Sequence, residues 1–167
     1  MAQLPNFSAL EPIMKNAFID HLETPLGPME ITADDRAVLS IHFVERTQAA
    51  QPNEVTRLCK AQLTEYFAGQ REQFELPLAP QGTEFQRGVW QALVEIGFGK
   101  TSTYSDIARR INNPKAVRAV GAANGKNPLT IVVPCHRIIG ADGSLTGYAS
   151  GVERKSWLLK HESNSLF

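Results

Sequence analysis

The sequence has few cysteines, no long apolar run and no excess of charge of either sign. Two cysteines among 167 residues cannot form a disulfide framework, so we expect a reducing compartment in which a thiol stays free. No run approaches the roughly 18 apolar residues of a membrane span, and the N-terminus lacks the cationic and apolar regions of a signal peptide. With 43% hydrophobic and 20% charged residues, the composition predicts a soluble, globular protein of the cytoplasm.

The formal net charge is zero, but the charges are divided unevenly along the chain. Residues 1–82 carry six basic and eleven acidic side chains, a net of −5, whereas residues 83–167 carry eleven basic and six acidic ones, a net of +5. A basic half indicates a polyanionic partner that is bound by one face of the protein. The alternative is a basic surface that docks on the acidic half of the same chain, and charge alone leaves both open.

The apolar patterns predict two domains that meet at Gly82, after a proline-containing linker at 76–82. The first, residues 1–82, is expected to be an α/β (α+β) scaffold. Its strands are expected near 17–23, 29–33 and 38–44, followed by an amphipathic helix over 53–69. Cys59 lies on the apolar stripe of that helix, which predicts a buried packing residue. Residues 1–16 are expected to be poorly tied down.

The second domain, residues 83–167, is predicted to be mostly helical and winged-helix-like, with a helix-turn-helix. Thr83 and Gln86 have the spacing of a capping box at the start of a helix that ends at Gly97. Ser102 or Thr103 is expected to cap a short second helix, and a third is expected over 115–124.

The third predicted helix has few large side chains, and Arg118 is the long cation in its middle. A helix so rich in alanine and glycine can lie close to whatever it contacts. In a basic region this favours close approach to nucleic acid. The alternative is tight packing against other helices of the same protein.

Cys135 follows an apolar run at 129–134, which predicts a buried strand that ends at Pro134 and holds the thiol rigidly. His136 and Arg137 come next, and cationic neighbours favour the nucleophilic thiolate. Glu162, in the last helix, is the candidate to orient the imidazole. The Cys-His pair has no CxxC or HxxxH companion, so we expect no metal and no cofactor. The residues alone indicate a DNA-binding half with a candidate cysteine nucleophile.

Residues 131–140, Ile-Val-Val-Pro-Cys-His-Arg-Ile-Ile-Gly, resemble the active-site signature of the O6-alkylguanine-DNA alkyltransferases, also called methylated-DNA–protein-cysteine methyltransferases. The resemblance extends in order from Phe85 to Glu162, while the acidic first half is similar only in outline. It implies a small, ribonuclease-H-like sheet in the first domain. It also implies an enzyme of DNA repair that irreversibly moves an alkyl group from guanine O6, and from thymine O4, to its own cysteine.

The resemblance further implies a role for each of five catalytic residues. Cys135 is the nucleophile, and His136 acts as its base through a water. Glu162 holds the imidazole, Asn127 braces the segment by hydrogen bonds, and Tyr104 donates a proton toward guanine N3. The partner implied is double-stranded DNA that contains O6-alkylguanine, bound in the minor groove by a monomer with no role for a membrane.

By the same resemblance, Arg118 enters the base stack and fills the gap that the flipped nucleotide leaves; its commoner alternative use is a phosphate contact. The other residues expected to contact DNA are Ser105, Asn113, Ala119, Ala122 and Ala123. The flipped base would be bound by Tyr104, by backbone groups of Cys135 and Ile138, and by the loop at Tyr148 and Ala149. Ala149 stands where relatives often carry serine. The chain also lacks the Cys/His cluster that holds a structural zinc in some relatives.

Two other functions stay open at this point. A non-catalytic DNA binder or transcription factor would use the helix-turn-helix without accepting an alkyl group, and a cysteine hydrolase would turn over esters or amides. The chemistry of the alkyltransferase reaction predicts a single use of each molecule, because the product is a thioether that nothing in the motif can hydrolyse. The methylated base also lies inside the duplex, so it must first be flipped out of the stack.

Overall fold

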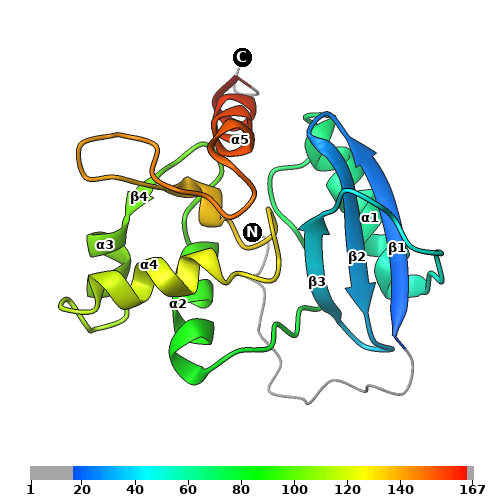
Figure 1. Cartoon of the computed structure of the whole chain (residues 1–167), viewed down its shortest axis with the longest axis horizontal. Coiled ribbons are helices and arrows are strands. Elements are labelled where there is room, and N and C mark those ends of the chain that lie inside the picture. Colours follow the sequence, from blue (N-terminus) through cyan, green and yellow to red (C-terminus); the bar gives the residue numbers. More distant parts are fainter. Residues whose placement is uncertain (1–16, 165–167) are drawn as a thin grey trace. The chain divides into compact units, whose positions relative to one another are not determined.

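The computed structural model describes residues 17–164, and the chain forms two compact units, Met1–Gln81 and Gly82–Phe167 (Figure 1). Along the chain, the boundary between the units lies between Gln81 and Gly82, whereas the sequence analysis predicted it after Gly82. The expectation for residues 1–16 lies outside the described residues. The roles given to the two halves stay predictions.

The first unit is built on a three-stranded antiparallel sheet in the order β1-β2-β3. Its strands are β1 (Phe18–Thr24), β2 (Gly27–Ala33) and β3 (Val38–Phe43), close to the predicted ranges. Gly27 closes the tight turn between β1 and β2 at a φ of 113°, a conformation that favours glycine. Alternate residues of the strands point into the core, where Met29, Ile31 and Ile41 are fully buried.

The helix α1 (Glu54–Phe67) packs against the sheet of the first unit (Figure 1). It begins in a capping box in which the Asn53 side chain accepts the backbone N–H of Thr56 at 2.9 Å. The apolar stripe of α1 is buried, as the period of three and four residues predicts, and it includes Cys59 at 0% exposure. The prediction that Cys59 packs in the core is therefore confirmed.

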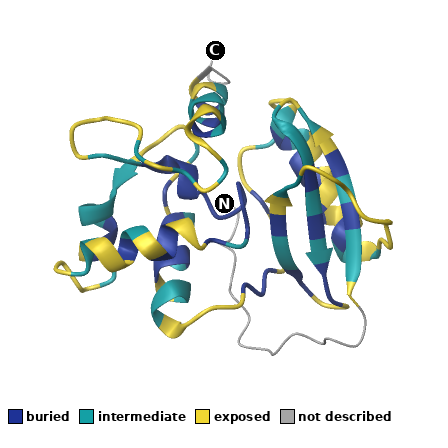
Figure 2. Ribbon diagram, in the orientation of Figure 1, coloured by how far each residue is buried: buried dark blue, intermediate teal, exposed yellow. Residues whose placement is uncertain are grey.

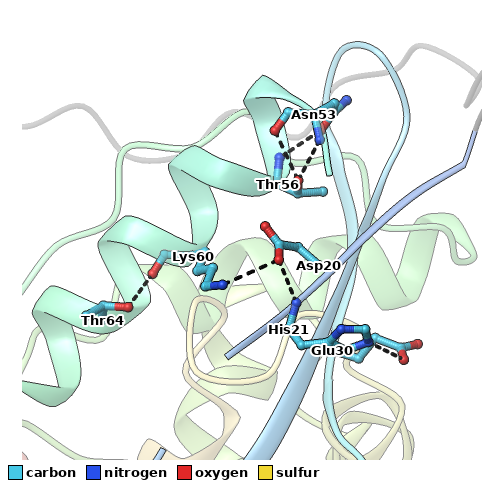
Figure 3. A network of polar contacts seen from close by, with 7 residues as sticks. All are labelled: Asp20, His21, Glu30, Asn53, Thr56, Lys60 and Thr64. Carbon is cyan, nitrogen blue, oxygen red and sulfur yellow. Dashed lines mark hydrogen bonds and ion pairs between the residues drawn. The ribbon is translucent and has the colours of Figure 1, made fainter. Parts of the chain in front are cut away.

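Polar contacts join α1 to the sheet and β1 to β2 (Figure 3). Asp20 of β1 is buried; its carboxylate accepts the backbone N–H of His21 at 2.9 Å and lies 3.5 Å from the Lys60 ammonium of α1. On the neighbouring strand, Glu30 pairs with the His21 ring at 3.2 Å. These contacts link α1 to β1 and β1 to β2.

The second unit consists of four α-helices, a short 3₁₀ helix and two very short strands within the described residues. The α-helices are α2 (Glu84–Val94), α3 (Tyr104–Arg110), α4 (Val117–Gly125) and α5 (Val152–Asn164). The remaining elements are β4 (Ser102–Thr103), η1 (Cys135–Arg137) and β5 (Ile138–Ile139). The predicted fold class, a small sheet domain with a mostly helical second domain, is confirmed. None of the helices in the described residues has both the length and the hydropathy to cross a membrane.

The predicted caps of the second unit are present. Thr83 and Gln86 form a reciprocal capping box at the start of α2, and Thr103 accepts the backbone N–H of Asp106 at the start of α3. The helix α2 ends at Val94, before the predicted Gly97, because the N–H groups of Glu95 and Ile96 turn to carbonyls only three residues back.

Trp90 of α2 packs against Gly82, the first residue of the second unit, and bonds to α4. The indole is 1% exposed and donates its Nε1–H to the Ala123 carbonyl at 2.8 Å. A Cβ added to Gly82 would lie 2.5 Å from the ring of Trp90, so only glycine fits there without displacing the indole. Figure 2 shows that α4 has one buried face and one exposed face. Val120, buried at 0% exposure, lies on the packed face.

One predicted element is wrong. Residues 129–134 do not form a strand; they form a turn in which Thr130 and Val133 make an isolated bridge and Ile131 has a φ of 76°. The Asn127 side chain stabilises the turn by bonding its backbone. It accepts the N–H of Leu129 at 2.9 Å and donates to the Val133 carbonyl at 2.8 Å. The run is apolar because it is buried in the core, and not because it belongs to a sheet.

Candidate active site

The Cys135 thiol lies at the start of η1, directly after this turn, and the residue is 5% exposed. The Asn127 amide nitrogen lies 3.1 Å from Sγ, so the amide that shapes the turn also contacts the sulfur. A second amide, that of Asn124 in α4, lies 3.5 Å from the Cys135 carbonyl. The prediction placed the thiol at the end of a strand. The structure instead fixes it by the side chain of Asn127 and the packing of the turn.

The two residues that follow Cys135 in the chain form a buried group of charges with Glu162 of α5. The His136 Nε2 is 2.7 Å from Glu162 Oε2, and the Arg137 guanidinium binds both carboxylate oxygens of Glu162, at 2.8 and 3.1 Å. Arg137 also donates to the Ile96 carbonyl at 2.6 Å. The sequence analysis named Glu162 as the partner of His136, and the structure brings the two together. Arg137 was expected to favour the thiolate of Cys135, and its pairing with Glu162 was not predicted.

Burial and the neighbouring charges indicate which ring nitrogen of His136 carries the proton. Burial favours the neutral form of Glu162, but hydrogen bonds and charges from His136 and Arg137 outweigh it and hold the pKa of this carboxyl well below its usual range. Burial lowers the pKa of His136, although Glu162 opposes the change. A neutral imidazole must therefore donate its Nε2–H to the carboxylate. Its Nδ1, which is buried and has no hydrogen-bond partner among the described residues, is the nitrogen that can take up a proton.

The structure corrects the expected activation of the thiol by His136 and Arg137. The imidazole favours its neutral form, and the Arg137 charge is compensated by Glu162. Burial raises the pKa of Cys135, opposed by hydrogen bonds from Asn127 and Tyr148 and by the positive charge of Lys155. The cation that favours the thiolate is therefore Lys155, from α5.

Lys155 is an unusual lysine because it is 0% exposed. Its ammonium makes two long contacts, at 3.5 Å, to the carbonyl and the hydroxyl of Thr146, and no carboxylate among the described residues pairs with it. Sequence reasoning missed this residue. The signal was present, because Lys155, Leu158 and Glu162 follow the three- and four-residue spacing of the buried face of α5.

Tyr104 is brought to this site by the pairing of β4 with β5. The two strands are parallel, with Ser102 opposite Ile138 and Thr103 opposite Ile139, so the residues that follow them lie close together. Tyr104 follows β4, and the loop 140–151 follows β5. The phenol oxygen of Tyr104 lies 2.6 Å from the Thr146 hydroxyl of that loop. The Tyr104 ring rests against α4, where a Cβ on Gly121 would lie 3.8 Å away, an ordinary contact.

The residues expected to read the base differ in exposure. Ile138 is fully buried and its N–H donates to the Cys135 carbonyl, so its side chain is part of the core. The Tyr148 hydroxyl is buried. Burial is the main cause that raises the pKa of Tyr148 well above its usual value, and the neighbouring Cys135 raises it further. Ala149 is exposed.

The residues expected to contact DNA lie on α3, α4 and the turn between them. Arg118, Ala119 and Ala122 are exposed on α4, Asn113 is exposed before it, and Ser105 is half-buried at the start of α3. Ala123 departs from the expectation: it is 3% exposed on the face that packs against Trp90, so its side chain belongs to the core. In residues 17–164, no cluster of three or more histidine, cysteine or acidic side chains is placed to hold a metal ion.

Two family models match this chain, and together they span both units. The 6-O-methylguanine DNA methyltransferase ribonuclease-like domain matches residues 17–80, and the DNA binding domain of the same methyltransferase matches residues 84–164. The chain belongs to the 6-O-methylguanine DNA methyltransferase family. The resemblance seen in the sequence is thereby confirmed.

Relatives of known name agree with this membership. The methylated-DNA–protein-cysteine methyltransferase of Methanosarcina acetivorans is 47% identical over 149 residues, which cover 85% of this chain and 96% of that protein. The constitutive enzyme of that name from Bacillus subtilis is 48% identical, over 84% of this chain and 92% of its own length. The crystal structure of the Mycobacterium tuberculosis OGT in complex with DNA is 40% identical, with a TM-score of 0.81 over 87% of this chain and 92% of that one.

Proposed function

We propose that this protein repairs DNA by taking the alkyl group from O6 of guanine onto the sulfur of Cys135, once per molecule. One observation supports the assignment above all: a buried thiol, contacted by an amide, is followed in the chain by a histidine whose Nε2 is bound to a carboxylate and whose Nδ1 can accept a proton. The relatives described above are named for the same reaction. The acceptor, and the role of each residue around it, are our assignment.

In the proposed reaction the sulfur displaces guanine from the alkyl carbon. The thiol gives its proton to His136 Nδ1, through a bridging water as the family pattern implies, and Glu162 stabilises the imidazolium that forms. The new bond joins Sγ to carbon, and the bond between that carbon and O6 breaks. Tyr104 supplies a proton to N3 of the departing guanine, and the proton taken by His136 replaces it by way of solvent. The protein keeps the alkyl group as a thioether on Cys135, so each molecule can react only once.

The reducing cytoplasm suits this chemistry, because the acceptor has to remain a free thiol. Both cysteines of the chain are free, and Cys135 is sheltered from oxidants by burial. We propose that one copy of the chain is sufficient for the reaction, since each residue assigned to it comes from the second unit of the same chain.

The test of this function is a titration of the wild-type protein with a duplex that contains O6-methylguanine. The intact mass should rise by about 14 Da, the mass of one methylene, with at most one methyl group taken up per protein molecule. Peptide mapping should place the added mass on Cys135. Repeated turnover by one molecule, or turnover of an ester without a change in mass, would favour a hydrolase and refute the proposal.

The exposed face of α4 is the surface we propose for the DNA, with Arg118 entering the stack to replace the flipped nucleotide. Arg118→Ala should then slow repair of the duplex about tenfold or more, because extrusion of the base costs a few kcal/mol. Reaction with free O6-benzylguanine, which needs no extrusion, should change less than about twofold. Arg57→Ala, an exposed arginine of α1, is the control. Equal losses on the two substrates would remove this role.

A further inference from the structure

The contact between Thr146 and Tyr104 raises the question of which hydroxyl donates. The two oxygens are 2.6 Å apart, and one proton lies between them. A phenol is the better donor of the two, so an isolated pair would have Tyr104 donating to Thr146. In that arrangement the phenol proton would be occupied and unavailable to a base.

The buried Lys155 favours the opposite arrangement, in which Thr146 donates to Tyr104. An ammonium can only donate, so its contact at 3.5 Å places positive charge on the lone pairs of the Thr146 oxygen. A second donation, from Lys155 to the Thr146 carbonyl at 3.5 Å, holds the same residue from its backbone. The Thr146 oxygen becomes a poorer acceptor, and its own hydrogen becomes a better donor, because bonded groups polarise one another in series.

We infer that Thr146 is a positioning residue of the transfer reaction: Lys155 donates to the Thr146 hydroxyl, this hydroxyl donates to the phenol oxygen of Tyr104, and the phenol proton is left free to reach the extruded base. The inference rests on the proposed function, and it deepens it by explaining how the acid is prepared. The same lysine that favours the thiolate also orients the proton for the leaving group. The attack of sulfur and the departure of guanine are thereby coupled through one ammonium.

The surroundings of Thr146 support a specific position for it. Gly140 and Ser144 close a tight turn through a backbone hydrogen bond of 2.9 Å, and a Cβ on Gly140 would lie 2.7 Å from the Ser144 hydroxyl. Thr146 follows this turn and is half-buried. Its hydroxyl therefore reaches Tyr104 from a segment that is constrained on one side by the turn and on the other by Lys155.

The experiment measures methyl transfer from duplex DNA by the full chain, as the maximal rate constant and as the DNA concentration at half saturation. Thr146→Val keeps the shape of the side chain and removes the hydroxyl. We expect its maximal rate constant to fall about tenfold, the equivalent of about 1.4 kcal/mol, with half saturation changed less than twofold. Thr146→Ser should restore the rate. Ser144→Ala, which removes an exposed hydroxyl of the same loop, is the matched control.

A double-mutant cycle separates this role from a structural one. If Thr146 acts through the phenol, Thr146→Val should cause no further loss in a Tyr104→Phe protein. Additive losses in the double variant would overturn the inference. So would a Thr146→Val rate equal to or above that of the wild type, since the phenol would then be the donor. If Thr146→Val does not fold, Thr146→Ala enters the same cycle.

The outcomes also distinguish this inference from the function on which it rests. A wild-type protein that takes up no methyl group refutes the proposed function. A wild-type protein that takes up one methyl group, beside a Thr146→Val variant that does so as fast, refutes only the orientation of the phenol proton.

Discussion

Both cysteines of this chain are buried, but the regions around them differ. Cys59 lies on the apolar stripe of α1, where burial and the negative charge of Asp20 both raise the pKa of the thiol, to about 12. Around Cys135, burial acts in the same direction but is opposed by the Asn127 amide, the Tyr148 hydroxyl and the Lys155 ammonium. Burial alone makes a thiol inert, and the surrounding donors make a buried thiol usable.

The two units also differ in how completely their buried polar groups are paired. In the first unit the carboxylate of Asp20 has both an N–H and an ammonium near it (Figure 3). Among the described residues, Asn124 Oδ1 and His136 Nδ1, both in the second unit, are buried side-chain atoms without a hydrogen-bond partner. Unpaired buried groups cost stability. The second unit carries this cost around Cys135.

Substituting the two thiols one at a time should give very different results. Cys135→Ser should lower methyl uptake by at least about a thousandfold, because a hydroxyl is a far weaker nucleophile than a thiolate. Cys59→Ala should leave uptake at one methyl per folded molecule and lower only the unfolding temperature. Intact mass after incubation with the methylated duplex measures both. Uptake that persists in Cys135→Ser would show that another atom is the acceptor.

The second prediction compares the ion pairs of the two units. Glu162→Gln leaves the buried Arg137 uncompensated and should lower the free energy of unfolding by about 3 kcal/mol. Glu65→Gln removes the partner of Arg71 in an ion pair on the surface of the first unit, and should cost less than about 0.5 kcal/mol. Denaturant titration measures both. Equal costs would mean that the Glu162 cluster contributes no more to stability than a surface pair.

The pH dependence of stability sharpens the same prediction. The fold holds the pKa of Glu162 below its ordinary value of 4.5, so the stability it contributes is fully present above that pH and is lost as the pH falls through the lowered pKa. Glutamine does not titrate. The unfolding free energy of Glu162→Gln should therefore fall less steeply in acid than that of the wild type, and parallel profiles would contradict the assignment.

The smallest expected effect concerns the cation beside the thiol. Lys155→Met removes a charge that favours the thiolate, so the pKa of Cys135 should rise further and methyl transfer at pH 7 should slow about tenfold. The loss should shrink as the pH is raised, because more thiolate forms. Lys160→Met, on the exposed side of α5, should match the wild type at each pH. A loss that is constant with pH would show that Lys155 acts only by packing.

The sequence predicted those parts of the fold that depend on near neighbours. Capping residues such as Thr83 and Asn53 start helices where they were expected, and alternation placed β1 to β3, because these signals depend on residues a few positions apart. The turn at 129–134 was not predictable in the same way. The Asn127 side chain bonds two of its backbone groups, and the Val133 N–H bonds the Leu129 carbonyl within the turn. An apolar run has the same pattern in such a buried turn as in a strand.

The residues of the candidate site likewise fall into those that the sequence predicted and those that it did not. Cys135, His136 and Glu162 were found through a motif and its resemblance to a family, and the structure places the imidazole and the carboxylate in contact. The pairing of Arg137 with Glu162 and the burial of Lys155 were not predicted, because a contact across 25 residues and burial on one helix face depend on the folded packing. Thr146 carries no signal in the sequence, since its partner Tyr104 is 42 positions away.

Ile131 bears on how the reactive sulfur is kept in place. A branched side chain seldom adopts a φ of 76°, and the conformation costs on the order of 1–3 kcal/mol. Glycine would adopt it freely, but glycine has nothing to bury, whereas Ile131 is 1% exposed. The burial of the Ile131 side chain offsets the backbone penalty and anchors the turn that leads to Cys135. A nucleophile that reacts only once has no later cycle in which to correct a misplaced approach.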